Sequence, residues 1–322
     1  QRFQKLEGGL SGVPSGFPSI DKITLGWQAS DLIILAARPS VGKTAFALNL
    51  ARNAAVEFNE PVAFFSLEMT SMELLDRLIA TESGISSDKL KGKLKLLPEE
   101  WQVLEQSVGR IVKAPIYIDE TPGITLTEFV AKSKRLVREK GVKIIFVDYL
   151  QLMHSGKPQL GGFSKVQEVT EISNTLKTTA KELNIPIIAL AQLNRNLMSR
   201  MGSNGKPVLS DLKDSGSIEQ DADIVVFLHR PGLIGLAEDL EEQAKTEVIF
   251  AKNRNGQVGS VEMRYVGHLM KFEDVQATFY ESAMNSETVR TPARKEVSYQ
   301  PQMLQQAYNP FDEFTQNDFM QP

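Results

Sequence analysis

The stretch LIILAARPSVGKTAFALNLA, residues 32–51, decides the fold. Its first six residues are apolar and predict a buried strand, and apolar side chains recur at helical spacing after Lys43. The segment between them, ARPSVGKT, follows the pattern G-x-x-x-x-G-K-[ST] at every fixed position except the first, where Ala37 replaces glycine. A strand, a loop and a helix in this order place backbone N–H groups and a helix N-terminus around a phosphate. The sequence therefore predicts a nucleotide-binding loop.

The fixed positions of this loop have separate tasks. Gly42 lets the backbone approach a phosphate closely, Lys43 can reach the β- and γ-phosphates, and the Thr44 hydroxyl can hold Mg²⁺. Ala37 suits the opening position if its φ is negative, since only then does a Cβ cost nothing. A chance G-K-T at a helix start is the weaker alternative, because the strand before it and the helix after it are both present. The predicted cofactor-binding residues are Ala37, Arg38, Pro39, Ser40, Val41, Gly42, Lys43, Thr44 and Ala45.

Short apolar runs alternate with helical patterns after this loop, as in a parallel sheet covered by helices. One helix is expected to begin after Thr125, which has capping-box spacing to Glu128, and to end at Gly141. Asn255-Gly256 between the last two runs favours a hairpin, because both residues tolerate positive φ. The predicted fold class is α/β, a mostly parallel twisted sheet flanked by helices with an antiparallel hairpin at its edge. The expected strands span residues 32–37, 62–67, 114–119, 143–148, 186–191, 223–229, 246–252 and 258–266.

Polar residues follow three of the predicted strands. Asp148 ends KIIFVD, which is typical of an acid that orients Mg²⁺ through water, so Thr44 and Asp148 are the predicted metal-site residues. Glu68 follows VAFFSL and is a candidate general base, and Gln192 follows PIIALA and is a candidate γ-phosphate sensor. Ligands bind at the carboxyl edge of such sheets, where all three residues are expected. The pattern around Asp148 is common by itself, but the phosphate loop upstream makes it a strong signal. Glu68 and Gln192 could each instead be a solvated residue that leaves a strand, and the functional interpretation is favoured for both.

A long polar segment, AQLNRNLMSRMGSNGKPVLSDLKDSGSIEQDAD, connects two predicted strands. Loops of this length in compact domains are usually functional or disordered. Lysine, serine and exposed backbone N–H groups suit contacts to a nucleic-acid backbone that do not depend on base sequence, especially around KDSGS. The segment contains no aromatic residue, so base stacking is not expected here. The predicted nucleic-acid contacts are Arg195, Lys213, Asp214, Ser215 and Gly216.

Lys252 and Arg254 place two cations beside the predicted hairpin turn. Such a pair is more often an ordinary solvated turn. In an oligomeric nucleotide hydrolase, however, an arginine that projects into a neighbouring subunit can stabilise charge that develops on the γ-phosphate. We therefore add both residues to the candidate catalytic set.

Composition excludes several other classes of protein. There is no cysteine among the 322 residues, so disulfides and thiolate metal sites are absent, and any metal must use oxygen ligands. The net charge of −4 argues against a surface that grips nucleic acid everywhere, so a nucleic-acid site must be a local patch. No apolar run approaches a membrane span and no signal peptide is evident, so we expect a soluble cytosolic protein without a membrane partner.

These motifs together resemble one family, the C-terminal ATPase domain of bacterial replicative helicases, or DnaB-like family. The resemblance covers residues 10–280, and the alanine-opened loop is itself that family's form of the motif. It implies a RecA-like P-loop fold, a homohexameric ring, and ATP- and Mg²⁺-dependent 5′ to 3′ translocation on single-stranded DNA. The motifs that carry the resemblance are GFPSIDKITLGWQASDLIILAARPSVGKTAFALN, FFSLEM, FVDYLQLM, ALAQLNR, SDLKDSGSIEQDAD and KNRNG.

The resemblance also implies roles for the candidate residues. Lys43 is expected at the phosphates, Glu68 and Asp148 as the base and the Walker B acid, and Gln192 as the link from nucleotide to DNA loops. The cations at positions 252 and 254 are expected in the adjacent subunit's site. The segment 213–216 is expected to contact DNA, although the family usually has arginine at position 213, and lysine keeps the charge but loses the bidentate fork.

The chain is expected to have three parts: an entry segment and linker remnant rich in glycine, serine and proline (1–30), the ATPase domain (31–280), and a tail rich in glutamine and proline that is expected to be disordered (281–322). The family's N-terminal helical domain is expected to precede residue 1, together with contacts to a helicase loader and primase in the full-length protein. A cytoplasmic, nucleoid-associated location is expected. The alternatives are a RecA- or RadA-like recombinase, which the SDLKDSGSIEQDAD segment disfavours, and a nucleotide-binding ring subunit with little turnover, which Glu68 and Arg254 disfavour.

Overall fold

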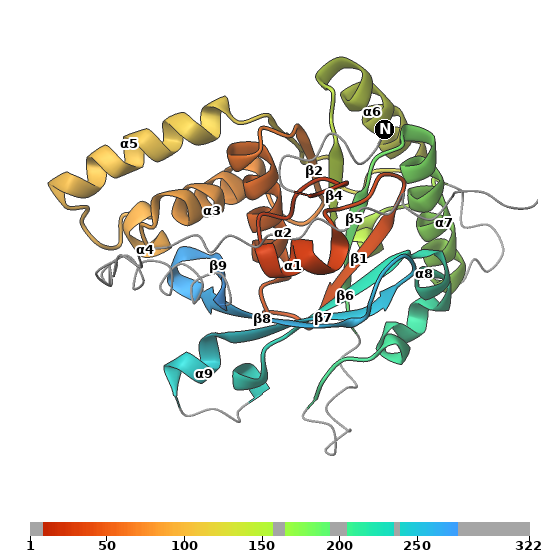
Figure 1. Cartoon of the computed structure of the whole chain (residues 1–322). Helices are drawn as coiled ribbons and strands as arrows, with labels where there is room; N and C mark the ends of the chain where they lie inside the picture. The colour runs from red at the N-terminus through yellow and green to blue at the C-terminus, as the bar shows by residue number, and fades with distance from the viewer. Residues whose placement is uncertain (1–8, 157–164, 194–204, 235–238, 276–322) are drawn as a thin grey trace, which may run out of the picture. The chain divides into compact units, whose positions relative to one another are not determined.

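A nine-stranded sheet runs through the protein, as a computed structural model shows for residues 9–156, 165–193, 205–234 and 239–275 (Figure 1). The strand order is β3-β2-β4-β5-β1-β6-β7-β8-β9. The six strands from β3 to β6 in this order pair in parallel, and β6, β7, β8 and β9 pair antiparallel. The predicted α/β fold, mostly parallel with an antiparallel edge, is therefore confirmed.

Eight of the nine strands were expected from the sequence, and their ends lie within two residues of the prediction. The ninth, β9, was not predicted, because four residues are too few to show a period in sequence. The strands are β1 (Leu32–Ala37), β2 (Val62–Ser66), β3 (Ile116–Asp119), β4 (Ile144–Asp148), β5 (Ile187–Gln192), β6 (Ile224–His229), β7 (Lys245–Asn253), β8 (Gly259–Val266) and β9 (Lys271–Asp274).

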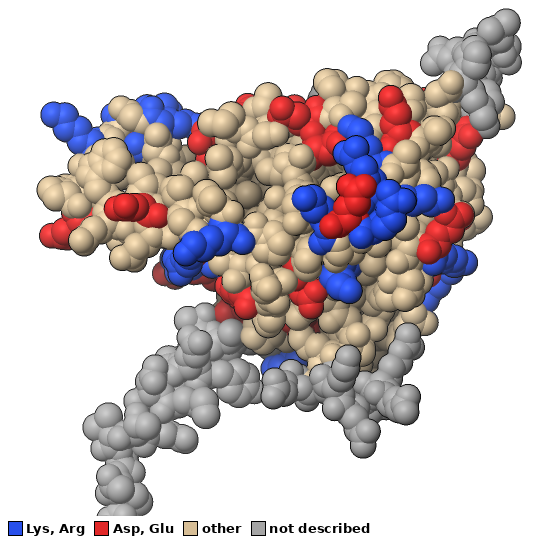
Figure 2. Space-filling model, turned by 90° about the horizontal axis from the view of Figure 1, so that it is seen from above, with Lys and Arg blue, Asp and Glu red and all other residues tan. Residues whose placement is uncertain are grey.

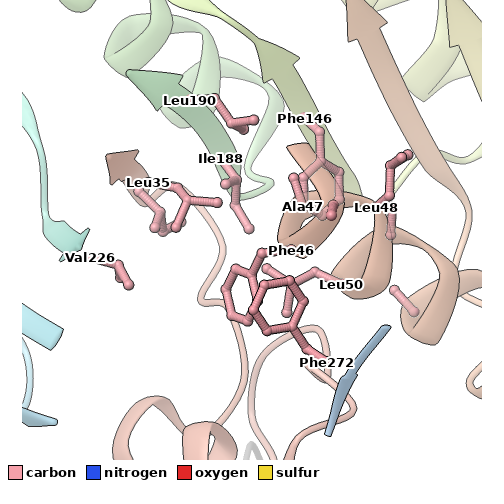
Figure 3. Close-up of a cluster of buried hydrophobic side chains, with 14 of the residues drawn as sticks. Leu35, Phe46, Ala47, Leu48, Leu50, Phe146, Ile188, Leu190, Val226 and Phe272 are labelled. Carbon is pink, nitrogen blue, oxygen red and sulfur yellow. The ribbon is translucent and has the colours of Figure 1, made fainter. Parts of the chain in front are cut away.

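Helices cover both faces of this sheet, and the alternation of side chains along β1 shows how. Ile33 and Leu35 pack on one face into a cluster that also contains side chains of α2, α3 and α5. Figure 3 shows Leu35 of β1 and Phe46 of α2 in this cluster. Leu32 and Ile34 pack on the other face, against α6, α7 and α8. Parallel strands buried on both faces are apolar at every position, as β1 is. The helices are α1 (Pro18–Thr24), α2 (Lys43–Arg52), α3 (Ser71–Ser83), α4 (Ser87–Leu90), α5 (Pro98–Lys113), α6 (Leu126–Lys140), α7 (Lys165–Leu183), α8 (Gly216–Asp221) and α9 (Leu240–Ala244).

The predicted capping box of α6 is present. The Thr125 side chain accepts a hydrogen bond from the Glu128 N–H, and the Glu128 carboxylate accepts one from the Thr125 N–H at 3.0 Å. Gly141 ends the helix in the left-handed region, with φ 67°. These local signals define both ends of α6.

The turn between β7 and β8 differs from the prediction. The predicted antiparallel hairpin is present, but the β7–β8 pairing stops at Phe250 and Gly259, and neither Asn255 nor Gly256 has positive φ. The expected turn geometry is therefore wrong. The Asn253 side chain organises the turn instead: Oδ1 accepts from the Asn255 N–H at 3.3 Å, and Nδ2 donates to the Gln257 carbonyl at 3.3 Å. A Cβ at position 256 would lie 2.5 Å from Asn253 Nδ2, so a larger residue there would displace the side chain that organises the turn.

Parts of the expected organisation lie outside the described residues. These are residues 1–8 of the expected linker remnant and the whole tail from 281 onward. The linker remnant also contains α1, which the sequence analysis did not predict. In the described part of the chain, no helix is long and apolar enough to cross a membrane.

Candidate nucleotide-binding site

The loop between β1 and α2 has the shape that a phosphate loop needs. Ala37 is the last residue of β1 and its φ is not positive, as predicted. Gly42 lies immediately before α2 with φ 108°, a backbone conformation that residues other than glycine rarely adopt. Ser40 also has positive φ, 65°, which the sequence did not indicate. Since α2 begins at Lys43, its unpaired N-terminal N–H groups face the loop.

Asp148 and Thr44 meet at the carboxyl edge of the sheet. The Thr44 hydroxyl donates to Asp148 Oδ2 at 2.7 Å, which joins the start of α2 to the end of β4. Asp148 is 1% exposed, and its Oδ1 has no hydrogen-bond partner among the described residues. Burial raises the pKa of this carboxyl, while Lys43 and the Thr44 hydrogen bond lower it. A buried acceptor without a partner is the feature expected of a site that receives a ligand or ion.

Lys43 is held between acids and an aromatic ring. Its Nζ lies 4.7 Å from the centroid of the Tyr149 ring. Burial lowers the pKa of Lys43, and the charges of Asp148 and Glu68 oppose that shift. A desolvated ammonium at the start of a helix suits the binding of phosphate oxygens.

Glu68 and Gln192 lie at the same edge of the sheet. Glu68 is exposed, two residues beyond the end of β2, and its charge acts on both Lys43 and Asp148. Gln192 is the exposed last residue of β5 and pairs in register with Ala37. The structure therefore brings Glu68, Asp148, Gln192 and the phosphate loop to one edge, as predicted.

A divalent ion at this site would have few protein ligands. The described residues contain no group of three or more His, Cys, Asp or Glu side chains that could hold a metal. Thr44 and Asp148 offer only oxygen atoms, which suits Mg²⁺, an ion that keeps several waters and is often bound by one or two protein groups together with phosphates. The residues therefore fit Mg²⁺ bound jointly with a nucleotide.

Arg230 and Tyr265 also border the loop, and the sequence analysis missed both. The Arg230 guanidinium lies 4.6 Å from the Tyr265 ring centroid, and its Nη1 donates to the Val41 carbonyl at 3.4 Å. Tyr265 packs on Phe272, and a Cβ on Gly42 would lie 3.4 to 3.7 Å from these two rings. Arg230 directly follows β6, so the strand-end rule that selected Gln192 could have found it. Tyr265 gave no such signal, because it comes from an antiparallel strand.

Lys252 and Arg254 lie at the opposite, amino-terminal edge of the sheet. Lys252 belongs to β7 and pairs in register with Val225 near the start of β6, and Arg254 follows the end of β7. The Arg254 side chain is 48% exposed and forms an ion pair with Asp223. The structure therefore does not bring these two cations to the phosphate loop of their own chain.

The predicted nucleic-acid contacts are only partly described. Arg195 lies outside the described residues. The backbone of the segment 213–216 is helical, at the junction of a 3₁₀ helix (Leu209–Ser215) and α8, so the expected long loop is wrong for this part. On the face shown in Figure 2, described acidic and basic side chains are interspersed, in keeping with a local rather than a general nucleic-acid surface.

Comparison with known proteins gives one consistent result. The DnaB-like helicase C terminal domain family matches residues 12–274. The replicative DNA helicase DnaB of Geobacillus stearothermophilus is 46% identical over 283 residues, which cover 88% of this chain and 61% of that protein. The replicative DNA helicase DnaC of Bacillus subtilis (strain 168) is 44% identical over 280 residues, with coverages of 87% and 60%. The chain thus spans about 60% of the length of these relatives.

Solved structures agree with this result. One of them, described as an ATPase domain, superposes with a TM-score of 0.77 at 36% identity, over 84% of this chain and 94% of that one. A second structure is of a DnaB-like replicative helicase and was described with its interactions with primase. It superposes with a TM-score of 0.77 at 36% sequence identity, over 84% of this chain and 64% of that one. The family match, the sequence identity and the shared fold agree, and this chain therefore belongs to the DnaB-like helicase C-terminal domain family.

Proposed function

We propose that this chain is the ATP-driven motor of a replicative DNA helicase, which works as a homohexameric ring that translocates 5′ to 3′ on single-stranded DNA. The observation that carries the proposal is the buried Asp148, hydrogen-bonded through one oxygen to Thr44 and without a described partner at the other. Family membership adds the expected substrate, since the relatives are named replicative DNA helicases.

The residues at the carboxyl edge divide the work of hydrolysis. Lys43 and the N–H groups at the start of α2 bind phosphate oxygens, and Thr44 and Asp148 hold Mg²⁺, which when bound neutralises charge on the phosphates. The Glu68 carboxylate accepts a proton from the attacking water. The Gln192 side chain reports on the γ-phosphate from the end of β5. The Arg230 guanidinium, which lies over the Tyr265 ring, offers a planar surface beside the loop on which a nucleobase can stack.

Lys252 and Arg254 act on the neighbouring subunit's nucleotide. Both lie at the sheet edge opposite their own phosphate loop, so they serve catalysis only where another copy presents its site to them. A cation near the γ-phosphate stabilises negative charge in the transition state. The ring is therefore the active unit.

Single-stranded DNA is bound at the segment 213–216, together with Arg195. Lysine and backbone N–H groups there contact phosphates, so affinity falls as salt rises and depends little on base sequence. A primase and a helicase loader are further proposed partners. The structural relative described with primase supports the first of these partners.

Two measurements test the proposed function. ATP hydrolysis by the chain is expected to rise with single-stranded DNA, and a forked duplex with a 5′ tail is expected to be unwound in preference to one with only a 3′ tail. Particles formed with an ATP analogue and single-stranded DNA are expected to show a six-membered ring. Strand exchange on a filament would instead indicate a recombinase, and nucleotide binding without turnover would indicate a passive ring subunit.

A further inference from the structure

We propose that Asp223 is the positioning residue for Arg254, the residue that holds its guanidinium in place at the amino-terminal edge of the sheet. The inference rests on the proposed function, in which Arg254 acts on the neighbouring subunit. Asp223 lies between α8 and β6 and is the last residue of the motif SDLKDSGSIEQDAD. It is 5% exposed, and its side chain bonds to β1, to α7 and to Arg254.

Two donors other than Arg254 hold the Asp223 carboxylate in place. Oδ2 accepts a hydrogen bond from the Leu32 N–H at 2.8 Å and another from the Lys177 ammonium. These contacts tie it to the start of β1 and to α7, which belong to the packed core. Oδ1 lies 3.4 Å from Arg254 Nη1, and the Asp223 carbonyl accepts from the Arg254 N–H at 2.9 Å. Because two other donors already hold the carboxylate, this ion pair orders only the arginine side chain, which lowers its entropic cost.

The carboxyl end of α8 supplies the remaining acceptors for the same two cations. Lys252 Nζ donates to the Glu219 carbonyl at 2.6 Å, and Arg254 Nη2 donates to the Gln220 carbonyl. The last carbonyls of a helix have no partner within it and are free to accept these bonds. Since α8 begins at Gly216, in the segment proposed to contact DNA, one short helix joins that contact to the cations. DNA bound by one subunit can therefore influence the nucleotide site of the next.

A purely structural role for Asp223 would act in its own subunit. Its bond to Leu32 supports the start of β1, and β1 leads directly into the phosphate loop. Loss of that support would damage the nucleotide site in cis. Loss of the contact with Arg254 would damage the site of the neighbouring subunit, so the two roles differ in which subunit is affected.

Mixed rings distinguish these roles. Asp223→Asn keeps one oxygen for Leu32 and Lys177 but removes the charge that holds Arg254. We expect its ATP turnover at saturating ATP to fall about 10-fold, with KM changed less than about 2-fold, as for an interaction made mainly in the transition state. Mixed with Glu68→Ala subunits, it should recover activity, because one class of interface then has an intact base and an intact Arg254. Mixed with Arg254→Ala subunits, it should show no recovery, because every interface lacks a correctly held arginine.

The reverse pattern overturns the inference: recovery with Arg254→Ala but not with Glu68→Ala places the defect in cis, and normal turnover by Asp223→Asn alone also rules the role out. A mixture of Glu68→Ala and Arg254→Ala is the reference. If the reference fails to recover, the proposed action of Arg254 in trans is wrong, and with it the ring as the active unit. If the reference recovers and the mixture of Asp223→Asn with Glu68→Ala does not, only the inference about Asp223 fails. Should Asp223→Asn lose its cooperative thermal transition, Asp223→Glu, which keeps the charge but displaces the oxygens, is tested in the same mixtures with the same expected pattern.

Discussion

The two edges of the sheet use buried carboxylates in opposite ways. At the nucleotide edge, where Lys43, Thr44 and Asp148 meet, one Asp148 oxygen binds Thr44 and the other has no partner in the described part of the chain. At the opposite edge, both oxygens of Asp223 are occupied, and the exposed group is the guanidinium of Arg254.

This difference separates a site that receives a ligand from a site that presents a group. An unpartnered acceptor in a buried position costs free energy that binding of an ion or donor can restore. A fully bonded acid instead fixes the donor that it holds, so that the donor projects in a defined position. The comparison therefore supports the proposed roles, in which one edge binds the nucleotide and the other presents Arg254 to a neighbouring subunit.

The largest effect should come from removing the cation of the nucleotide edge. Lys43→Ala is expected to lower ATP hydrolysis by about 10²- to 10³-fold, because the ammonium stabilises charge on the transferred phosphoryl group. Lys140→Ala, an exposed lysine at the end of α6, is the matched control and should leave the rate unchanged. Normal hydrolysis by Lys43→Ala would show that the nucleotide binds elsewhere. Steady-state phosphate release measures both variants.

Asp148→Asn tests whether the unpartnered acid is kept for function at the expense of stability. Its activity should fall about 100-fold, since a neutral amide holds Mg²⁺ poorly. Burial raises the pKa of Asp148, so the ionised form destabilises the folded chain at pH 8, and the free energy of unfolding of Asp148→Asn should be higher there. Activity assays and urea unfolding at pH 8 give the two values. A variant that loses activity and stability together would mean that the charge supports the fold.

Local sequence patterns were sufficient to predict the core of this fold. A strand buried on both faces is a continuous apolar run, so β1, β2, β4 and β5 could be read directly. The geometry of the β7–β8 turn could not be predicted in this way. The Asn-Gly pattern predicts a turn closed by backbone hydrogen bonds, whereas here the Asn253 side chain makes the bonds that organise the turn. A side chain that bonds across a turn leaves no periodic signal.

The candidate site was predictable to the extent that it lies at strand ends. Glu68, Asp148 and Gln192 come to the phosphate loop because parallel strands share a carboxyl edge. Tyr265 could not be placed in this way, since it depends on the register of antiparallel strands. The partners of Asp223 lie 31 to 191 residues away along the chain, so their convergence is visible only in the folded protein.

The opposite edge contains a second buried acid, Asp31, whose surroundings disfavour its charged form. Burial and repulsion from Asp223 raise the pKa of Asp31 from 3.8 to about 6. The native state therefore binds more protons than the unfolded state between about pH 4 and 6, stability falls as pH rises through this window, and the loss persists above it. Asp31→Asn should remove that slope and raise the free energy of unfolding at pH 7.5 by about 3 kcal/mol. Urea unfolding from pH 4 to 8 checks this, with the exposed Asp76→Asn as control. Equal slopes in all three proteins would rule out Asp31 as the source.

The smallest effect should come from loosening α8, the helix that joins the proposed DNA contact to the opposite edge. Ser173 Oγ on α7 donates to Asp221 Oδ2 at 2.8 Å and holds the carboxyl end of α8, whose carbonyls bind Lys252 and Arg254. Ser173→Ala should leave basal ATP hydrolysis unchanged but lower its stimulation by single-stranded DNA by about 5-fold, as the loss of one hydrogen bond allows. The control is Thr179→Ala, because this buried hydroxyl bonds within α7. Equal DNA stimulation in both variants and the parent would show that α8 does not transmit the signal, whereas a defect confined to Ser173→Ala would extend the role of this edge from holding a cation to responding to DNA.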